Sequence, residues 1–280
     1  MDDNENIKNA ARAVKNADAI LITAGAGIGV DSGMPDFRGD SGFWKAYPPI
    51  AKLGKSFSEM ANPVWFEQDP KIAWAFYGHR LNLYRETVPH KGFEIMLDWA
   101  KNKPYGYFVY TSNVDGHFQK AGFSDKSIYE VHGSIHHFQC SKPCTYNIWD
   151  ASEIKIDVDL ELFEAQEPLP HCPTCGAIAR PNILMFGDWN WLGDRSSAQS
   201  DKYHNWLNDL QAANAKLVII ELGAGRAVPT VRMESQKTFR RNNTEFIRIN
   251  PRDYEVPEGG ISIPLGSKEG LERIVDIIGG

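Results

Sequence analysis

Long apolar runs, an excess of basic residues and frequent cysteines are all missing from this sequence. No stretch approaches the about 18 consecutive apolar residues of a transmembrane helix. Lys and Arg total 30 against 36 Asp and Glu, and the net charge of −6 argues against a broad nucleic-acid-binding surface. Four cysteines in 280 residues are too few for a disulfide scaffold. The acidic first residues lack the basic and apolar segments of a secretory signal, so we expect a cytoplasmic protein without nucleic-acid or membrane partners.

Short, continuous apolar runs alternate with helical patterns along much of the chain. The composition, 42% apolar and 24% charged, is that of a globular protein, and 280 residues allow one large domain or two ordinary ones. The apolar runs lie at residues 19–23, 106–110, 128–131, 216–220 and 245–249. Helical spacing covers residues 6–17, 93–99 and 203–210. Such runs separated by helices are typical of strands buried on both faces, so the sequence predicts a doubly wound parallel α/β sheet.

Two regions interrupt this alternation. Residues 39–85 are rich in Trp, Phe, Tyr and Pro, with helical patterns at 73–77 and 81–84. Residues 135–181 hold all four cysteines. Within the second region, residues 151–170 contain six acidic residues against one lysine, and we expect this segment to be an exposed insertion.

A glycine-rich loop follows the first predicted strand. Glycines at 25 and 27 allow a tight turn and a close approach to a pyrophosphate, whose oxygens the amides of the next helix can bind. The third glycine of the dehydrogenase fingerprint would fall at Val30, so that pattern does not fit. On their own, these glycines are weak evidence, and a tight strand-to-helix turn without a ligand is the alternative.

The residues that follow make this loop specific. Ser32-Gly33-Met34-Pro35-Asp36-Phe37-Arg38 comes directly after it. Here the chain resembles the sirtuins, the NAD-dependent protein lysine deacylases, whose signature is a Gly-Ala-Gly loop followed by Ser-Gly-Ile-Pro-Asp-Phe-Arg. Met34 in place of Ile and Gly29 in place of Ser are the departures. The resemblance implies NAD as cofactor and assigns to it, from this segment, Gly25, Ala26, Gly27, Asp36, Phe37 and Arg38.

Two further motifs stand where predicted strands end, the usual ligand side of a parallel sheet. Thr111-Ser112-Asn113-Val114-Asp115 is similar to the sirtuin Thr-Gln-Asn-Ile-Asp motif, with Ser in place of Gln. The resemblance places Ser112, Asn113 and Asp115 at the nicotinamide and its ribose, and makes Asn113 catalytic. His132 stands where sirtuins carry their general base, and a histidine can accept a proton from a ribose hydroxyl near neutral pH.

The cysteines form two close pairs, Cys140-x3-Cys144 and Cys172-x2-Cys175. Thiolates at these spacings can close a tetrahedral shell around one Zn²⁺, and an all-thiolate site is structural. Four free buried cysteines are the alternative. Sirtuins carry a structural zinc at the same point in the order of motifs.

Residues 73–80 bear on substrate choice. Tyr77 and Arg80 are one helical turn apart and share a face. A phenol and a guanidinium there can bind a distal carboxylate, and sirtuins that prefer succinyl, malonyl or glutaryl lysine carry this Tyr-x-x-Arg pair. The alternative is a core Tyr and a surface Arg in a simple deacetylase. Phe186 and Gly187 resemble the Phe-Gly-Glu segment that borders the sirtuin acyl-lysine tunnel, with Asp188 in place of Glu.

The sequence departs most from the sirtuin pattern in the segments that the resemblance places at the far side of the cofactor. Gly223, Ala224 and Gly225 stand where sirtuins have Gly-Thr-Ser, so two hydroxyl side chains are replaced. Backbone amides there could still meet phosphate or ribose. Asn250 matches the sirtuin Asn that bonds the adenosine ribose.

The resemblance covers about residues 19–274 and implies a two-domain organisation. A Rossmann-like NAD-binding domain would comprise residues 1–38, 87–134 and 182–280. A smaller domain, formed by insertions at 39–86 and 135–181, would hold a helical module and a zinc module.

The activity implied is removal of acetyl, or of succinyl or malonyl, from lysine in a protein or peptide, releasing nicotinamide and O-acyl-ADP-ribose. Two alternatives remain open. One is an NAD glycohydrolase or ADP-ribosyltransferase using the same site. The other is an NAD or ADP-ribose sensor without turnover.

Overall fold

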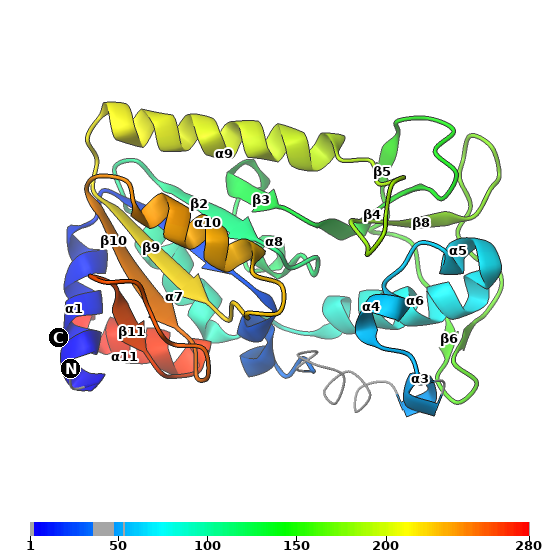
Figure 1. Ribbon diagram of the computed structural model, residues 1–280, viewed down its shortest axis with the longest axis horizontal. Helices are drawn as coiled ribbons and strands as arrows, with labels where there is room; N and C mark the ends of the chain where they lie inside the picture. Colours follow the sequence, from blue (N-terminus) through cyan, green and yellow to red (C-terminus); the bar gives the residue numbers. More distant parts are fainter. Residues whose placement is uncertain (1–2, 36–47, 53, 280) are drawn as a thin grey trace.

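A six-stranded parallel sheet forms the centre of the computed structural model, which describes residues 3–35, 48–52 and 54–279 (Figure 1). Its strand order is β11-β10-β9-β1-β2-β3. The strands are β1 (Ala19–Ala24), β2 (Tyr107–Thr111), β3 (Ile128–Glu130), β9 (Leu217–Leu222), β10 (Thr244–Ile249) and β11 (Ile261–Ile263). All five predicted apolar runs are strands, and the doubly wound parallel sheet is confirmed. The short edge strand β11 was not predicted.

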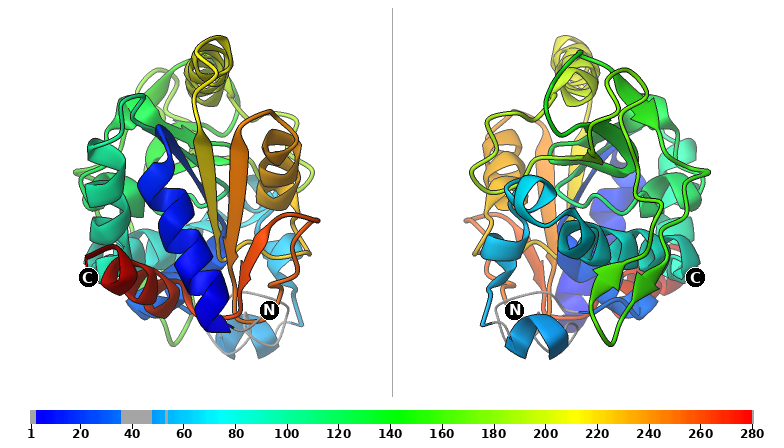
Figure 2. Two further views of the ribbon diagram at one scale, coloured as in Figure 1. Left: turned by 90° about the vertical axis from the view of Figure 1, so that its left-hand side faces the viewer. Right: turned by 90° about the vertical axis from the view of Figure 1, so that its right-hand side faces the viewer.

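Helices cover both faces of this sheet, which is why its strands need continuous apolar runs (Figure 2). One face packs against α1 (Asp3–Asn16), α7 (Lys91–Lys101), α8 (His117–Lys120) and α11 (Ser267–Gly279). The other packs against α9 (Asp194–Ala212) and α10 (Thr230–Phe239). The predicted helices lie within α1, α7 and α9. Among the described residues, no helix has the length and apolar character needed to cross a membrane.

The order of the strands reverses between β1 and β9. From β1 the chain proceeds to β2 and β3 on one side, and it later returns to β9, β10 and β11 on the other. The loops that follow β1 and β9 therefore lie at the point where the strand order reverses, at the carboxyl ends of the strands, which is the usual ligand site of such sheets. A short 3₁₀ helix, η1 (Ala26–Ser32), follows β1, and Gly33 ends it with φ +85°.

A second, antiparallel sheet begins where β3 ends. Its strand order is β5-β4-β8, with β4 (Gly133–Cys140), β5 (Ile148–Asp150) and β8 (Ala179–Ile183). Another 3₁₀ turn, η2 (Asp125–Ser127), precedes β3. The helices beside the second sheet are α3 (Pro48–Lys52), α4 (Phe57–Met60), α5 (Trp65–Gln68) and α6 (Pro70–Glu86). Aromatic side chains from α5, α6 and β4 share one core, in which Trp74 lies 4.9 Å from Phe138 between ring centroids.

The acidic segment at residues 151–170 is not simply an exposed insertion, and that expectation was wrong in part. It contains the hairpin of β6 (Val158–Asp159) and β7 (Glu164–Ala165). Its apolar residues Ile156, Phe163 and Leu169 are buried in the same core as α6. Gly78 permits this packing, because a Cβ there would lie 2.4 Å from Ile156 Cγ2. The acidic residues masked a short amphipathic pattern.

A buried ion pair joins two central strands. Glu221 on β9 and Arg248 on β10 are register partners, and their side chains are 0% and 1% exposed. Arg248 Nε donates to Glu221 Oε1 at 2.5 Å and Nη2 donates to Oε2 at 3.2 Å. Arg248 also donates to the carbonyl of Glu255. A buried pair of this kind is costly to break, because the remaining charge keeps its desolvation penalty without its partner.

Replacing Arg248 with Met is expected to lower the free energy of unfolding by about 3–5 kcal/mol, because Glu221 is left buried and unpaired. Denaturant unfolding followed by circular dichroism measures this. Arg273→Met is the matched control, since Arg273 pairs with Glu269 on the exposed surface of α11, and we expect a change below about 1 kcal/mol. The double variant Glu221→Leu, Arg248→Met should recover most of the loss. A loss in Arg248→Met no larger than in the control would contradict the assignment.

Candidate active site and zinc centre

A cavity of about 810 Å³ opens at the carboxyl ends of β1, β2 and β9, and the second sheet and α6 also contribute residues to it. Most residues that the sequence assigned to a site line this one space. The predicted cofactor residues in its lining are Gly25, Ala26, Ser112, Asn113, Asp115, His132, Gly223, Ala224 and Gly225. The predicted substrate residues in its lining are Tyr77, Arg80 and Phe186.

Three other predicted residues lie beside the cavity without lining it. The Gly27 amide donates to the carbonyl of Gly223 at 3.0 Å, and Gly187 turns the loop after β8 with φ +67°. Asn250 is fully buried and bonded to protein groups on both sides of its amide, so it shapes a loop and does not face the cavity. Asp36, Phe37 and Arg38 lie outside the described residues.

Two glycines bring the loops after β1 and β9 into backbone contact. A Cβ on Gly25 would lie 2.9 Å from the Cα of Ala224. A Cβ on Gly223 would lie 2.2 Å from the backbone nitrogen of Ile28, and its φ of +58° favours glycine in any case. This part of the cavity wall is therefore backbone, with little side chain in front of it. Such a wall fits a pyrophosphate, which backbone amides can bind at close range.

The loop after β2 supplies two polar side chains. Asn113 is 9% exposed, and its Nδ2 donates to the carbonyl of Gly25 at 3.2 Å, which ties this loop to the one after β1. Asp115 is 6% exposed and accepts from the amide of His117 at 2.9 Å. The ring of His136 donates from Nε2 to the Asp115 carbonyl at 2.8 Å. Both cavity residues are thus held by the protein before any ligand arrives.

His132 lies at the junction of β3 and β4. It is half-buried, and the desolvation of its ring lowers its pKa below 6.5, while a hydrogen bond with the Ser112 backbone opposes this shift. The amide of Leu184 donates to the His132 carbonyl at 2.9 Å and fixes the backbone there. A neutral imidazole facing the cavity at pH 7 can accept a proton.

Three residues on one face of α6 reach the other end of the cavity. Tyr77, Arg80 and Tyr84 follow one another at helical spacing and all line it. Arg80 Nη2 donates to Tyr84 Oη at 2.6 Å. Its guanidinium carbon also lies 5.4, 5.2 and 5.5 Å from the ring centroids of Phe57, Phe76 and Tyr84. Burial raises the pKa of the Tyr77 phenol, so it stays neutral.

Tyr84 was not predicted from the sequence. The available signal was its position four residues after Arg80, at which a phenol can accept from the guanidinium.

The loop after β8 is anchored by a buried ion pair. Arg180 donates to both carboxylate oxygens of Asp188, at 2.7 and 3.0 Å, and the two side chains are 1% and 0% exposed. Asp188, which stands in place of the expected Glu, also accepts from the amides of Met185 and Asn190. The pair fixes the turn that presents Phe186, whose ring centroid lies 6.2 Å from that of Phe57 at the edge of the cavity.

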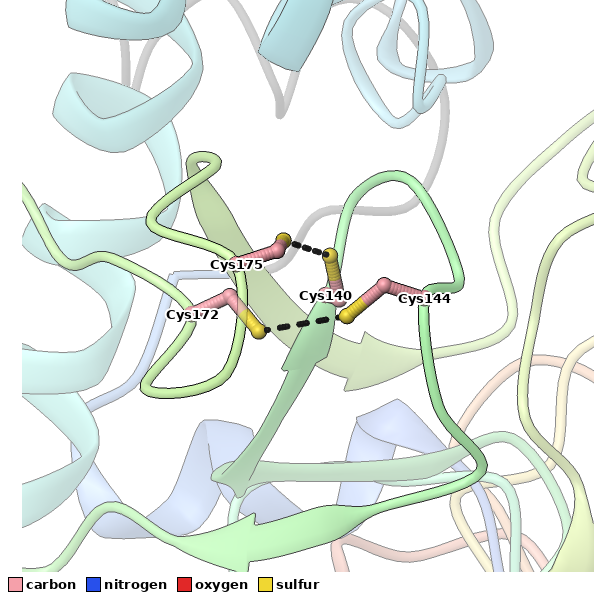
Figure 3. A group of neighbouring side chains, drawn as sticks. All are labelled: Cys140, Cys144, Cys172 and Cys175. Atoms are coloured by element: carbon pink, nitrogen blue, oxygen red, sulfur yellow. Dashed lines mark hydrogen bonds between the residues drawn. The ribbon is translucent and has the colours of Figure 1, made fainter.

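The four cysteines come together away from the cavity, at the far end of β4 and β8 (Figure 3). Their sulfur atoms all lie within 4.8 Å of one another. Cys140 and Cys175 are 3.7 Å apart between sulfurs, and Cys144 and Cys172 are 3.6 Å apart. Four thiolates at about 2.3 Å from one Zn²⁺ in a tetrahedron lie about 3.8 Å from each other. The four cysteines are therefore placed to bind one zinc ion, as the sequence predicted.

Comparison with known proteins agrees with this geometry. Residues 25–220 match the model of the Sir2 family. An NAD-dependent protein deacylase of Aquifex aeolicus is 30% identical over 270 residues, which cover 95% of this chain and 97% of that protein. The NAD-dependent protein deacylase of Pyrococcus furiosus is 34% identical over 62% of each chain. The NAD-dependent protein deacetylase of Saccharolobus solfataricus is 33% identical over 65% of each chain.

Solved structures share the fold. A Sir2 homologue in complex with ADP-ribose has a TM-score of 0.69 and 23% identity, covering 96% of this chain and 95% of that one. A Sir2 enzyme bound to a propionylated peptide has a TM-score of 0.66 and 20% identity, covering 98% of each chain.

Replacing Cys172 with Ala is expected to remove zinc from the purified protein and to lower its Tm by about 10 °C or more, because metal binding at such sites contributes directly to folding. Elemental analysis and thermal unfolding measure the two effects. Tyr146→Ala, an 84% exposed position in the loop between Cys144 and β5, is the control and should keep both zinc and Tm. Wild-type protein without zinc, or an unchanged Tm in Cys172→Ala, would contradict the assignment.

Proposed function

The chain belongs to the Sir2 family, and from this premise we propose that it is an NAD-dependent protein lysine deacylase. The observation that carries the proposal is that two sets of residues line one cavity. The glycine loops, Asn113, Asp115 and His132 line one part of it. Residues of α6 and Phe186 line another part, which we call the acyl wall. Relatives named as deacylases and a deacetylase, and a solved relative bound to a propionylated peptide, support an acylated protein or peptide as substrate.

NAD fits the residues present at one end of the cavity. The backbone wall of the two glycine loops suits its pyrophosphate, and Ser112, Asn113 and Asp115 would hold the nicotinamide and its ribose. When bound, NAD supplies the glycosidic bond to nicotinamide, whose cleavage opens a ribose carbon to the acyl oxygen. The chain's own task is to orient these groups in a site that excludes water.

His132 is proposed as the general base. Its lowered pKa keeps the imidazole neutral at pH 7, so that it can accept a proton from a ribose hydroxyl. In support of this role, it stands at the junction of the two sheets and lines the same cavity as the glycine loops and α6. Asn113 stabilises the same region by joining the loops after β1 and β2.

We further propose that the acyl group carries a carboxylate, as succinyl and malonyl do. Arg80 brings a permanent charge to the cavity wall, and its hydrogen bond to Tyr84 fixes where that charge lies. The aromatic faces around the guanidinium add cation–π attraction and exclude water. Tyr77, kept neutral by burial, can donate from its phenol to the same carboxylate. Acetyl-lysine would use none of these polar groups.

The proposal predicts NAD-dependent removal of succinyl faster than acetyl from one lysine peptide, with nicotinamide released in step. Chromatography of the peptide and of nicotinamide measures both. Faster acetyl removal would keep the deacylase and contradict the carboxylate site. Nicotinamide release without peptide product would indicate a glycohydrolase or an ADP-ribosyltransferase. NAD binding without turnover would indicate a sensor.

Substitutions on α6 test the proposed carboxylate site in the same assay. Arg80→Met should reduce kcat/KM for succinyl-lysine by about 10- to 100-fold, the value of a charge-assisted hydrogen bond, and leave acetyl-lysine within a few-fold. Tyr84→Phe removes only the acceptor that orients Arg80, so a loss of about 3- to 10-fold is expected. Lys71→Met, at an exposed position near the start of α6, is the control. Equal effects on both acyl groups would contradict the site.

The pH dependence tests His132. Because burial lowers the pKa of His132 below its usual value of 6.5, the acid limb of kcat/KM for NAD, where the base becomes protonated, should be centred below pH 6.5. Initial rates between about pH 5 and 8 measure this. His204→Ala, at an exposed position on α9, should leave the profile unchanged. An acid limb centred above 6.5 would contradict a desolvated His132 as the base.

A further inference from the structure

The loop after β9 lacks the hydroxyl side chains that the family resemblance leads one to expect, since Ala224 and Gly225 stand there. We infer that Arg232, on α10, replaces their contribution by holding the Ala224–Gly225 peptide so that the Gly225 N–H faces the cavity and binds an oxygen of the dinucleotide pyrophosphate or its ribose. The inference rests on the proposed use of NAD and identifies a positioning residue for it.

The Ala224 carbonyl is held by two donors at once. Arg232 Nε donates to it at 3.2 Å and Asn250 Nδ2 donates to it at 2.9 Å. Both donors are buried, at 8% and 0% exposed, and neither lines the cavity. The carbonyl therefore points into the protein, away from the cavity.

The geometry of the peptide group sets the direction of the Gly225 N–H. In a planar trans peptide the C=O and the following N–H point in opposite directions. With the Ala224 carbonyl turned inward, the Gly225 N–H is directed outward, and Gly225 lines the cavity. Gly225 has no side chain, so its amide is open to a ligand. The side chain of a Thr or Ser at this position would partly cover the amide.

Arg232 is itself held in place from a second loop. Its Nη2 donates to the carbonyl of Asp253, in the loop after β10. Asn250 Oδ1 accepts from the amides of Arg252 and Asp253 at 3.1 and 3.0 Å. Arg232 and Asn250 thus join the two loops that line this end of the cavity. The orientation of the peptide follows from helix α10, which carries Arg232, and from strand β10, which ends next to Asn250.

The charge of Arg232 acts in the same direction. Among the described residues its hydrogen bonds go to two carbonyls and not to a carboxylate. A positive charge one residue behind the Gly225 amide favours an anion in front of it. Arg226 is the arginine of the loop itself, but it is 60% exposed and pairs with Asp253 and Glu255 at 3.2 and 2.6 Å, so little of its charge is left for a phosphate.

Calorimetric titration with ADP-ribose tests the inference without relying on turnover. Arg232→Met should raise the Kd for ADP-ribose about ten-fold or more, and Arg232→Lys, which keeps the charge and one donor, should raise it less. Arg226→Met is the comparison variant, with an expected change below about two-fold. In the deacylation assay the KM for NAD should rise in Arg232→Met while kcat and the KM for the acylated peptide stay within about two-fold.

The amide itself is tested by a matched pair at Gly225. Gly225→Ala keeps the N–H, whereas Gly225→Pro removes it, so only the proline variant should lose about the same affinity as Arg232→Met. If both changes act on one amide, their effects are not additive. Adding Arg232→Met to the Gly225→Pro variant should then raise the Kd for ADP-ribose by less than about two-fold.

The outcomes separate this inference from the proposed function. Wild-type protein that binds neither ADP-ribose nor NAD would overturn the proposed function. Wild-type protein that binds both, with the Kd of Arg232→Met within about two-fold of it and with unchanged Tm, would overturn the inference alone. A loss of ADP-ribose affinity in Arg226→Met but not in Arg232→Met would also overturn the inference, and it would assign the binding of the anion to Arg226. Should Arg232→Met fail to fold, the Arg232→Lys variant and the Gly225 pair still decide.

Discussion

The loops after β1 and β9 touch through their backbones, and the position of the whole cavity depends on this contact. Gly25 and Gly223 approach so closely that a single Cβ on either would meet main-chain atoms of the other loop. The contact lies where the strand order reverses, so it narrows the crevice that the sheet leaves open there. It also removes side chains from the wall and leaves backbone amides, which suit a pyrophosphate. The Asn113 side chain extends the same unit to β2 through the Gly25 carbonyl.

The second sheet joins the zinc centre to the cavity through two strands. At one end of the β4–β8 pair, Gly133 is the partner of Ile183, next to His132 and to the loop that carries Phe186. At the other end, Cys140 is the partner of Ala179, next to the cysteine cluster. A metal that clamps one end of this pair fixes the register of both strands. A zinc ion at this centre would lie away from the cavity, yet it would help to hold His132 and Phe186 at their separation.

Much of the fold was predictable because its signals are local. A strand buried on both faces needs a continuous apolar run, and each of the five runs is a strand. Cysteine spacing predicted the metal centre for a similar reason, since two turns each supply two thiolates. The hairpin at 158–165 was hidden because its buried residues alternate with acidic ones. The edge strand β11 has only three residues and gives no pattern at all.

The contacts that orient the site residues could not be predicted, because they join positions far apart in the sequence. Asn250 shows this. The sequence motif predicts a ribose contact, whereas its side chain forms hydrogen bonds with the Ala224 carbonyl and with an amide of its own loop. Tyr84 and Arg232 belong to no sequence motif, and the roles that we propose for them follow from the atoms that they contact. A motif identifies residues that face a ligand, but the residues that hold them are found only in the fold.

Four buried arginines show how the chain divides its charge between folding and binding. Arg180 and Arg248 each meet a carboxylate, at 2.7 and 2.5 Å, and these pairs anchor a loop and two strands. Arg80 bonds a phenol and lies over aromatic rings, and Arg232 bonds backbone carbonyls. Arg80 lines one end of the cavity and Arg232 lies behind the wall of the other end, where the proposed ligands carry their negative charges. A phenol, aromatic rings and backbone carbonyls orient these two guanidinium groups, and we propose that an anionic ligand uses the electric field of each.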